Sequence, residues 1–199
     1  MCVSAAVLLV LAPGCLMPQS VDPANTRPHT IPRVDLTNLP DYLLQPFLTL
    51  DPQEQADVNP PCHCRLEVKI PPIIADDPTV NVEVRIFVDY DVNVTSSQRN
   101  DRVTLEGTFG SSETTRLFPP LELDSDKLGG FGLHVVELVI GEAAGFAPTT
   151  VFPPQRAMLP NFESSTFKFV VQVQPPNSNT RPQSCGDPPQ LPAQTKSCP

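Results

Sequence analysis

Apolar and polar residues alternate over a long stretch in the middle of the chain. In TVNVEVRIFVDYDV, every second residue from Val80 to Val92 is apolar or tyrosine, and the residues between them are mostly polar or charged. An extended strand points alternate side chains to opposite faces, so a period of two indicates a β-strand. The stretch therefore predicts a strand with one face in a protein core and the other face in water.

Several other segments have strand character, and the prolines limit what can lie between them. These segments are residues 65–70, 102–109, 134–140 and 166–173, with one or two short strands possible within 113–123. The 26 prolines exclude long helices but are tolerated in connections and in edge strands. About seven strands with turn-rich connections predict a single all-β, antiparallel β-sandwich over residues 62–175.

The segment GFGLHVVELVI carries a more specific signal. It resembles the penultimate strand of bacterial Ig-like and PKD-like domains, which often have the pattern Gly-x-His/Tyr-x-Val-x-Val. The matching residues are Gly132, His134, Val136 and Leu138. The resemblance implies that the sandwich is Ig-like, without the core tryptophan of antibody-type domains, because the chain contains no Trp.

The N-terminal stretch MCVSAAVLLVLAPGCLMPQS carries no charged residue. Its apolar run from Ala5 to Ala12 is shorter than the roughly 20 residues that a membrane-spanning helix needs, but it suits a secretory signal. The following LAPGC resembles the lipobox of bacterial lipoproteins. The resemblance implies a signal peptide over residues 1–14, cleavage after Gly14 and lipidation of Cys15. The alternatives are an ordinary secretory signal that is cleaved elsewhere and a buried N-terminal strand.

Charge and the lipobox resemblance together indicate a location and a class of partner. The formal net charge of −9 argues against binding to nucleic acid. The lipoprotein resemblance implies attachment to a membrane of the bacterial cell envelope through the N-terminal lipid. Leu16 and Met17 follow the cysteine, where Asp would favour the inner membrane, so we expect the outer membrane. The remaining partner would be an envelope protein or a glycan.

Proline-rich segments flank the predicted sandwich on both sides. We expect residues 15–61 to form an extended tether. Within them LPDYLLQPFLTL, residues 39–50, is apolar enough to dock on the domain as a first strand or a short helical turn. Residues 176–199 form a polar, proline-rich tail that would be disordered on its own.

Four cysteines lie outside the N-terminal stretch, and an even number in an exported chain predicts disulfides. They are Cys62, Cys64, Cys185 and Cys198. A bond between Cys62 and Cys64 would close a very small ring across an extended backbone, which disulfide geometry disfavours. We therefore expect each of these two cysteines to pair with one tail cysteine, so that the tail is pinned to the start of the domain.

Two clusters could instead hold a metal. Cys62-His63-Cys64 has ligands that suit copper or zinc if its thiols are free. Asp89, Asp91 and Asn93 form a D-x-D-x-N pattern of oxygen ligands that could hold calcium, although the glycine and glutamate of an EF-hand loop are missing. Asp124 or Asp126 could complete that site. We expect disulfides at the first cluster, solvated carboxylates at the second, and neither metal nor cofactor.

No catalytic motif accompanies the one histidine in a strong strand. His134 has neither a G-x-S-x-G elbow nor an H-E-x-x-H pair to work with, so we expect its ring to meet a nearby backbone group. The sequence therefore predicts a non-catalytic envelope lipoprotein whose Ig-like module binds a partner or helps to assemble a complex. The alternative is a periplasmic metal carrier or an enzyme that uses the cysteine–histidine or acidic clusters.

The connection at residues 141–165 is the candidate binding segment. It separates two strong strands by 25 residues, and loops beyond about 15 residues are often functional. Its large apolar residues could contact a partner, or they could fold down and close the end of the sandwich. The residues expected to bind the partner are Phe146, Phe152, Met158 and Phe162.

Overall fold

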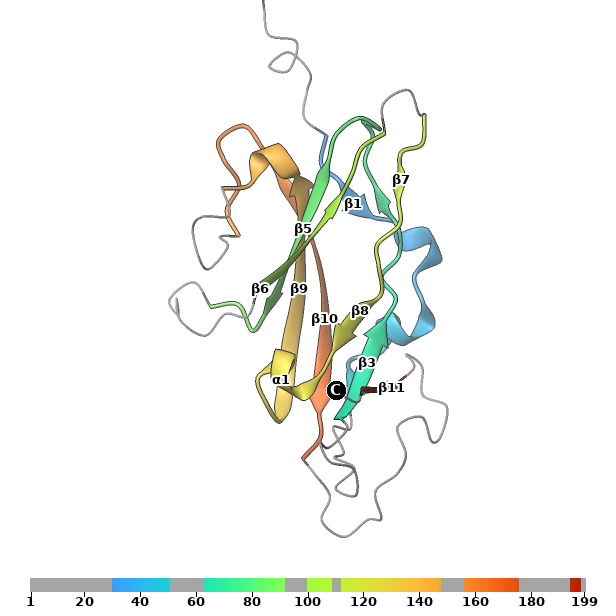
Figure 1. Ribbon diagram of the computed structural model, residues 1–199, viewed down its shortest axis with the longest axis vertical. Helices are drawn as coiled ribbons and strands as arrows, with labels where there is room; N and C mark the ends of the chain where they lie inside the picture. The colour runs from blue at the N-terminus through green and yellow to red at the C-terminus, as the bar shows by residue number, and fades with distance from the viewer. Residues whose placement is uncertain are drawn as a thin grey trace, which may run out of the picture.

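The computed structural model describes residues 30–50, 63–91, 100–108, 112–147, 156–175 and 194–197. Strands make up most of its regular structure (Figure 1). Helical segments among the described residues are short: η2 (Leu36–Asn38), η3 (Asp41–Leu44), α1 (Ser125–Leu128) and η4 (Ala143–Gly145). The protein therefore has the predicted all-β, sandwich-like fold.

Five strands form the larger sheet. Their order is β2 (Leu48–Leu50), β10 (Ser164–Val173), β9 (Gly132–Glu142), β5 (Val82–Val88) and β6 (Asn100–Leu105). The pairs among β10, β9, β5 and β6 are antiparallel, but β2 runs parallel to β10. The expectation of a wholly antiparallel sandwich is wrong at this edge. Because β2 and β10 lie far apart in the sequence, no hairpin fixes their relative direction.

Two three-stranded sheets make up the facing layer (Figure 1). One consists of β1 (Arg33–Val34), β4 (Ile73–Ile74) and β7 (Thr115–Arg116). The other consists of β11 (Gln194–Ser197), β3 (His63–Val68) and β8 (Leu121–Leu123). All pairs in this layer are antiparallel. β7 and β8 both lie within residues 113–123, where one or two short strands were expected.

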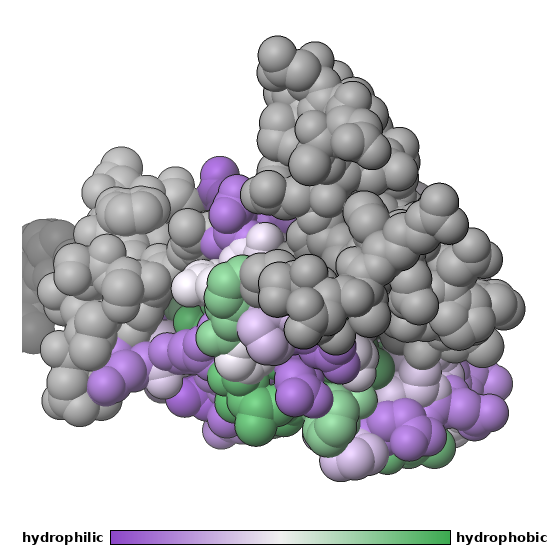
Figure 2. Space-filling model, turned by 90° about the horizontal axis from the view of Figure 1, so that it is seen from below, coloured by the Kyte–Doolittle hydropathy of each residue, from purple (hydrophilic) through white to green (hydrophobic). Residues whose placement is uncertain are grey.

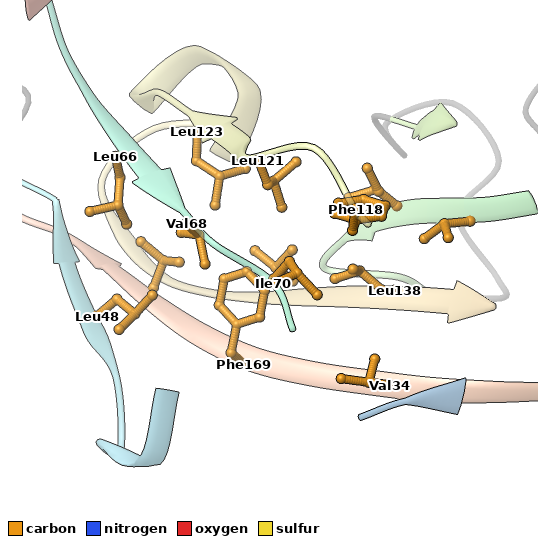
Figure 3. Close-up of a cluster of buried hydrophobic side chains, with 14 of the residues drawn as sticks. Val34, Leu48, Leu66, Val68, Ile70, Phe118, Leu121, Leu123, Leu138 and Phe169 are labelled. Atoms are coloured by element: carbon orange, nitrogen blue, oxygen red, sulfur yellow. The ribbon is translucent and has the colours of Figure 1, made fainter. Parts of the chain in front are cut away.

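The main core lies between the layers, where side chains from both converge (Figure 3). Val82, Val84 and Ile86 point into it from β5, as the alternating pattern predicts. The labelled core residues of Figure 3 come from both layers: Val34, Leu48, Leu66, Val68, Ile70, Phe118, Leu121, Leu123, Leu138 and Phe169. This core joins the two layers and holds the larger sheet in place.

Part of the expected tether belongs to the sandwich. Within residues 15–61, β1 pairs with β4 and β2 pairs with β10. Val34, Leu48 and Leu50 are buried in the core. The domain therefore begins before residue 62 and includes residues 33–50, because apolar side chains of this segment pack in the core between the layers.

The end of the chain returns to the start of the domain. β11 pairs with β3, with Lys196 opposite Cys64. Cys64 is buried and takes part in a disulfide bond. Its partner is not among the described residues, and neither are the other three predicted disulfide cysteines, Cys62, Cys185 and Cys198. The pairing of tail and domain start is thus seen in the backbone, while the disulfide connectivity stays a prediction.

Candidate functional site

The outer face of β5 is not in water. Glu83, Arg85 and Phe87 point away from the main core, yet all three are buried. The expectation of a solvated face is therefore wrong for this strand. The described parts of the connection between β9 and β10, residues 143–147 and 156–163, form the covering segment. Phe146 and Met158 from this segment pack with Phe87 and Val139 of the larger sheet in a second apolar cluster.

Arg85 ties this covering segment to the sheet. Its side chain is only 1% exposed. Its Nε donates to Glu83 Oε1 at 2.7 Å, and its Nη2 donates to the carbonyl oxygen of Ala147 at 2.8 Å. The guanidinium also lies 4.4 Å from the centre of the Phe146 ring, a distance typical of a cation–π contact.

The residues that we expected to bind a partner lie partly in this cover. Phe146 is 4% exposed and belongs to the second cluster, so for this residue the structure shows inward packing over the sheet face. Met158 forms a β-bridge with Phe146 and is half-buried, as is Phe162. Phe152 lies outside the described residues.

A cluster of charged residues marks the lower border of the cover. Glu137 on β9 is buried, and its Oε1 lies 2.6 Å from Arg156 Nη2 and 3.2 Å from Lys168 Nζ. The Arg156 guanidinium also lies 5.4 Å from the centre of the Tyr90 ring. Tyr90 in turn packs edge-to-face against Phe87. These contacts fix where the covered half of the sheet ends.

Beyond that border the outer face of β9 is apolar and exposed. Phe131, which precedes the strand, is 58% exposed, and Leu133 and Val135 within it are 64% and 42% exposed. We call these three residues the β9 surface. In register beside it on β10 are Val170, which faces Val135, and Gln172, which faces Leu133. Figure 2 views the molecule from this end, where hydrophobic residues reach the outside between hydrophilic ones.

His134 lies on the opposite side of the same strand and has a structural role. Its Nδ1 lies 2.7 Å from Asp89 Oδ2, and its Nε2 lies 3.1 Å from the carbonyl oxygen of Gly130. The predicted contact with a backbone group is thus confirmed. Asp89 also accepts a hydrogen bond from Val135 N and has a positive φ of 49°. Both groups are engaged in holding the start of β9 against the end of β5.

Two of the candidate metal ligands, Asp89 and Asp124, make contacts within the protein. Asp89 is occupied by His134, and Asp124 caps α1 by accepting from Lys127 N at 2.7 Å. Among the described residues, no three His, Cys, Asp or Glu side chains are grouped so that they could hold a metal ion. Asn93, Cys15 and the side chain of His63 lie outside what the structure describes.

No protein-family model, curated protein or solved structure matches this chain. Within the part of the chain that is described, no helix has the length and apolar character needed to cross a bilayer. The candidate site therefore rests on the geometry of the larger sheet.

The β9 surface was missed at the level of sequence, although its signal is visible. Phe131, Leu133 and Val135 alternate in GFGLHVVELVI, and the core-facing positions further along the strand, Val136 and Leu138, are apolar too. A strand that is apolar on both faces indicates burial on both faces. The covering segment buries the outer face of β9 around Val139, whereas Leu133 and Val135 near the start of the strand remain exposed.

Proposed function

We propose that this protein is a non-catalytic lipoprotein of the bacterial cell envelope, in which an Ig-like sandwich presents a binding surface to a partner protein. The observation that supports the proposal is the exposed β9 surface on the larger sheet. Exposed apolar residues that cluster on one face often mark interaction sites. The charged border at Glu137 fixes the surface on one side.

A protein partner fits this surface better than a glycan does. Leu133 and Val135 are aliphatic and offer no hydrogen bonds from their side chains. The centres of protein interfaces are apolar and depleted in charge, as this surface is. The surface therefore favours an apolar patch on another protein of the envelope.

The lipid anchor is the part of the proposal that rests on sequence alone. Replacing Cys15 by Ala should move the protein from the membrane fraction to the soluble fraction, because the acyl chains supply the attachment. Mass spectrometry of the mature chain should find Cys15 acylated at the N-terminus. An unmodified N-terminus elsewhere would remove the anchor from the proposal.

Leu133→Asp tests the binding role. Solubilised membranes should contain the native protein in a complex larger than the monomer, and the substitution should return it to monomer size. Leu117→Asp is the matched control, because Leu117 is 80% exposed and lies outside the β9 surface. Equal complex size for both variants and the native protein would contradict the assignment of this surface.

A further inference from the structure

The sandwich is open along the side where β6 and β8 are the outermost strands of their sheets. Between them lies a pocket of about 210 Å³. Its walls are apolar side chains of β5 and β8, and charged residues stand around it: Ile86, Val88, Asp101, Leu121, Glu122, Leu123 and Lys127. The pocket therefore reaches from the open side towards the main core.

β6 borders the pocket at Asp101, and the core-facing side of this strand is only partly covered further along. Val103 and Leu105 face the core opposite Val84 and Val82, and both remain half-buried. Asp101 follows the same alternation opposite Ile86. Among the strands that the structure describes, β6 pairs with β5 alone, so its second edge presents backbone groups that another strand can use.

Some charged side chains around the pocket already have partners within the protein, and others do not. Glu122 is paired with Arg65 at 2.9 Å, and Lys127 Nζ donates to the carbonyl oxygen of Glu122 at 2.9 Å. Asp101 accepts a hydrogen bond from the backbone of Arg102, and within the described residues it pairs with no cation. The charge left to be matched beside β6 is therefore the Asp101 carboxylate.

We propose that this groove binds an extended peptide segment of a partner protein, which adds to the free edge of β6. Residues directly opposite each other on neighbouring strands lie on the same face of the sheet and interact. The side chains of β6 therefore determine which residue types suit the added strand. Val103 and Leu105 call for apolar residues on the core-facing side of the added strand. Asp101 calls for Lys or Arg, and Arg102, on the outer side, calls for Asp or Glu.

For an antiparallel added strand, this complementarity gives a defined sequence pattern. Reading along the partner, the pattern is apolar, polar, apolar, acidic, basic. Charged residues on edge strands also discourage indiscriminate pairing. Here that same property selects the partner, because an uncharged or oppositely patterned strand would leave Asp101 without a counter-charge. The site is separate from the β9 surface and does not depend on the lipid anchor.

The test uses the full chain and a capped decapeptide in which two valines alternate with threonine and are followed by glutamate and lysine. Fluorescence anisotropy should show saturable binding that a scrambled peptide lacks. Amide signals of residues 101–105 and 121–123 should shift on titration in NMR spectra of the unaltered protein. Absence of binding, or shifts confined to other parts of the chain, would overturn the proposal without any variant.

Asp101→Lys adds a charge-reversal test. The substitution should weaken binding of the peptide about fivefold, because a like-charge pair replaces an attractive cross-strand pair. A peptide with the lysine replaced by glutamate should bind this variant better than it binds the native protein. Glu163→Lys is the matched control, since Glu163 is exposed just before β10, and it should leave binding unchanged.

Two further outcomes would overturn the proposal. One is equal loss of binding in Asp101→Lys and Glu163→Lys, which would show a general charge effect. The other is a concentration-dependent dimer of the native chain that Asp101→Lys abolishes, which would assign the edge to a second copy of the protein. Sedimentation of the native protein and of both variants detects such a dimer, and the binding titrations detect a general charge effect. None of them bears on the partner complex formed through the β9 surface.

Discussion

At the scale of single residues, the least expected feature is the burial of Arg85. The alternating pattern predicted that this face of β5 would be in water. Arg85→Ala should lower the free energy of unfolding by about 3–5 kcal/mol, because it leaves Glu83 buried without its counter-charge. It also removes the hydrogen bond to Ala147 that holds the covering segment. Urea denaturation measures the change.

The double variant Glu83→Gln, Arg85→Met is the control for charge. It removes both charges and keeps much of the volume, so it should recover a large part of the stability lost in Arg85→Ala. A loss below about 1 kcal/mol in Arg85→Ala would mean that the pair does not hold the cover in place.

Tyr42 gives a prediction for pH dependence. Burial raises the pKa of Tyr42 above its ordinary value of 10.0, the backbone hydrogen bond with Lys69 lowers it in part, and the Glu67 carboxylate raises it. The folded state therefore holds this proton more tightly than the unfolded chain does. Its contribution to stability is present below pH 10 and is lost as pH rises through the raised value.

Comparison with Tyr42→Phe isolates this contribution. At pH 8 the variant should be less stable by about 1 kcal/mol, because the hydroxyl that bonds both the N–H and the carbonyl oxygen of Lys69 is missing. Above pH 10 the difference should shrink, since only the native chain has this phenol to ionise on unfolding. Denaturation curves at both pH values provide the measurement, and a constant difference would contradict the assignment.

At the scale of elements, β1 and β2 decide where the domain begins. A chain that starts at Thr30 should fold, whereas one that starts at Pro61 should be largely unfolded. The shorter chain loses Val34, Leu48 and Leu50 from the core, at roughly 1.5–3 kcal/mol each, which approaches the whole stability of a typical domain. Circular dichroism melts of both chains test this. Equal melting temperatures would return residues 30–50 to the tether.

The strands differ in how well the sequence predicts them, and the reason is their length. The alternation of apolar and polar residues over 80–92 predicted β5, because the period of two repeats several times within this stretch. β1 and β2 contain only two and three residues, so no period can be recognised among the surrounding prolines. Burial of Glu83 and Arg85 was equally out of reach, because it depends on a segment some sixty residues later in the sequence that folds back over their strand.

At the scale of the whole molecule, β11 near the end of the chain pairs with β3. If Cys64 is joined to a tail cysteine, the bond closes a loop of roughly 100 residues or more, for which chain entropy gives about 4–5 kcal/mol of stabilisation. Reduction should therefore lower the melting temperature and expose residues 194–197 to protease. Non-reducing peptide mapping checks the pairing, and a bond between Cys185 and Cys198 would contradict it.

The proposed binding role depends on one half of the larger sheet being covered and on the β9 surface in the other half being exposed. A photoreactive amino acid placed at Leu133 in living cells tests this most directly, with Leu117 as the control position of the same residue type and high exposure. We expect a discrete crosslink to one envelope protein from position 133, and none from position 117. Crosslinking that is absent at 133, or is the same at both positions, would contradict it.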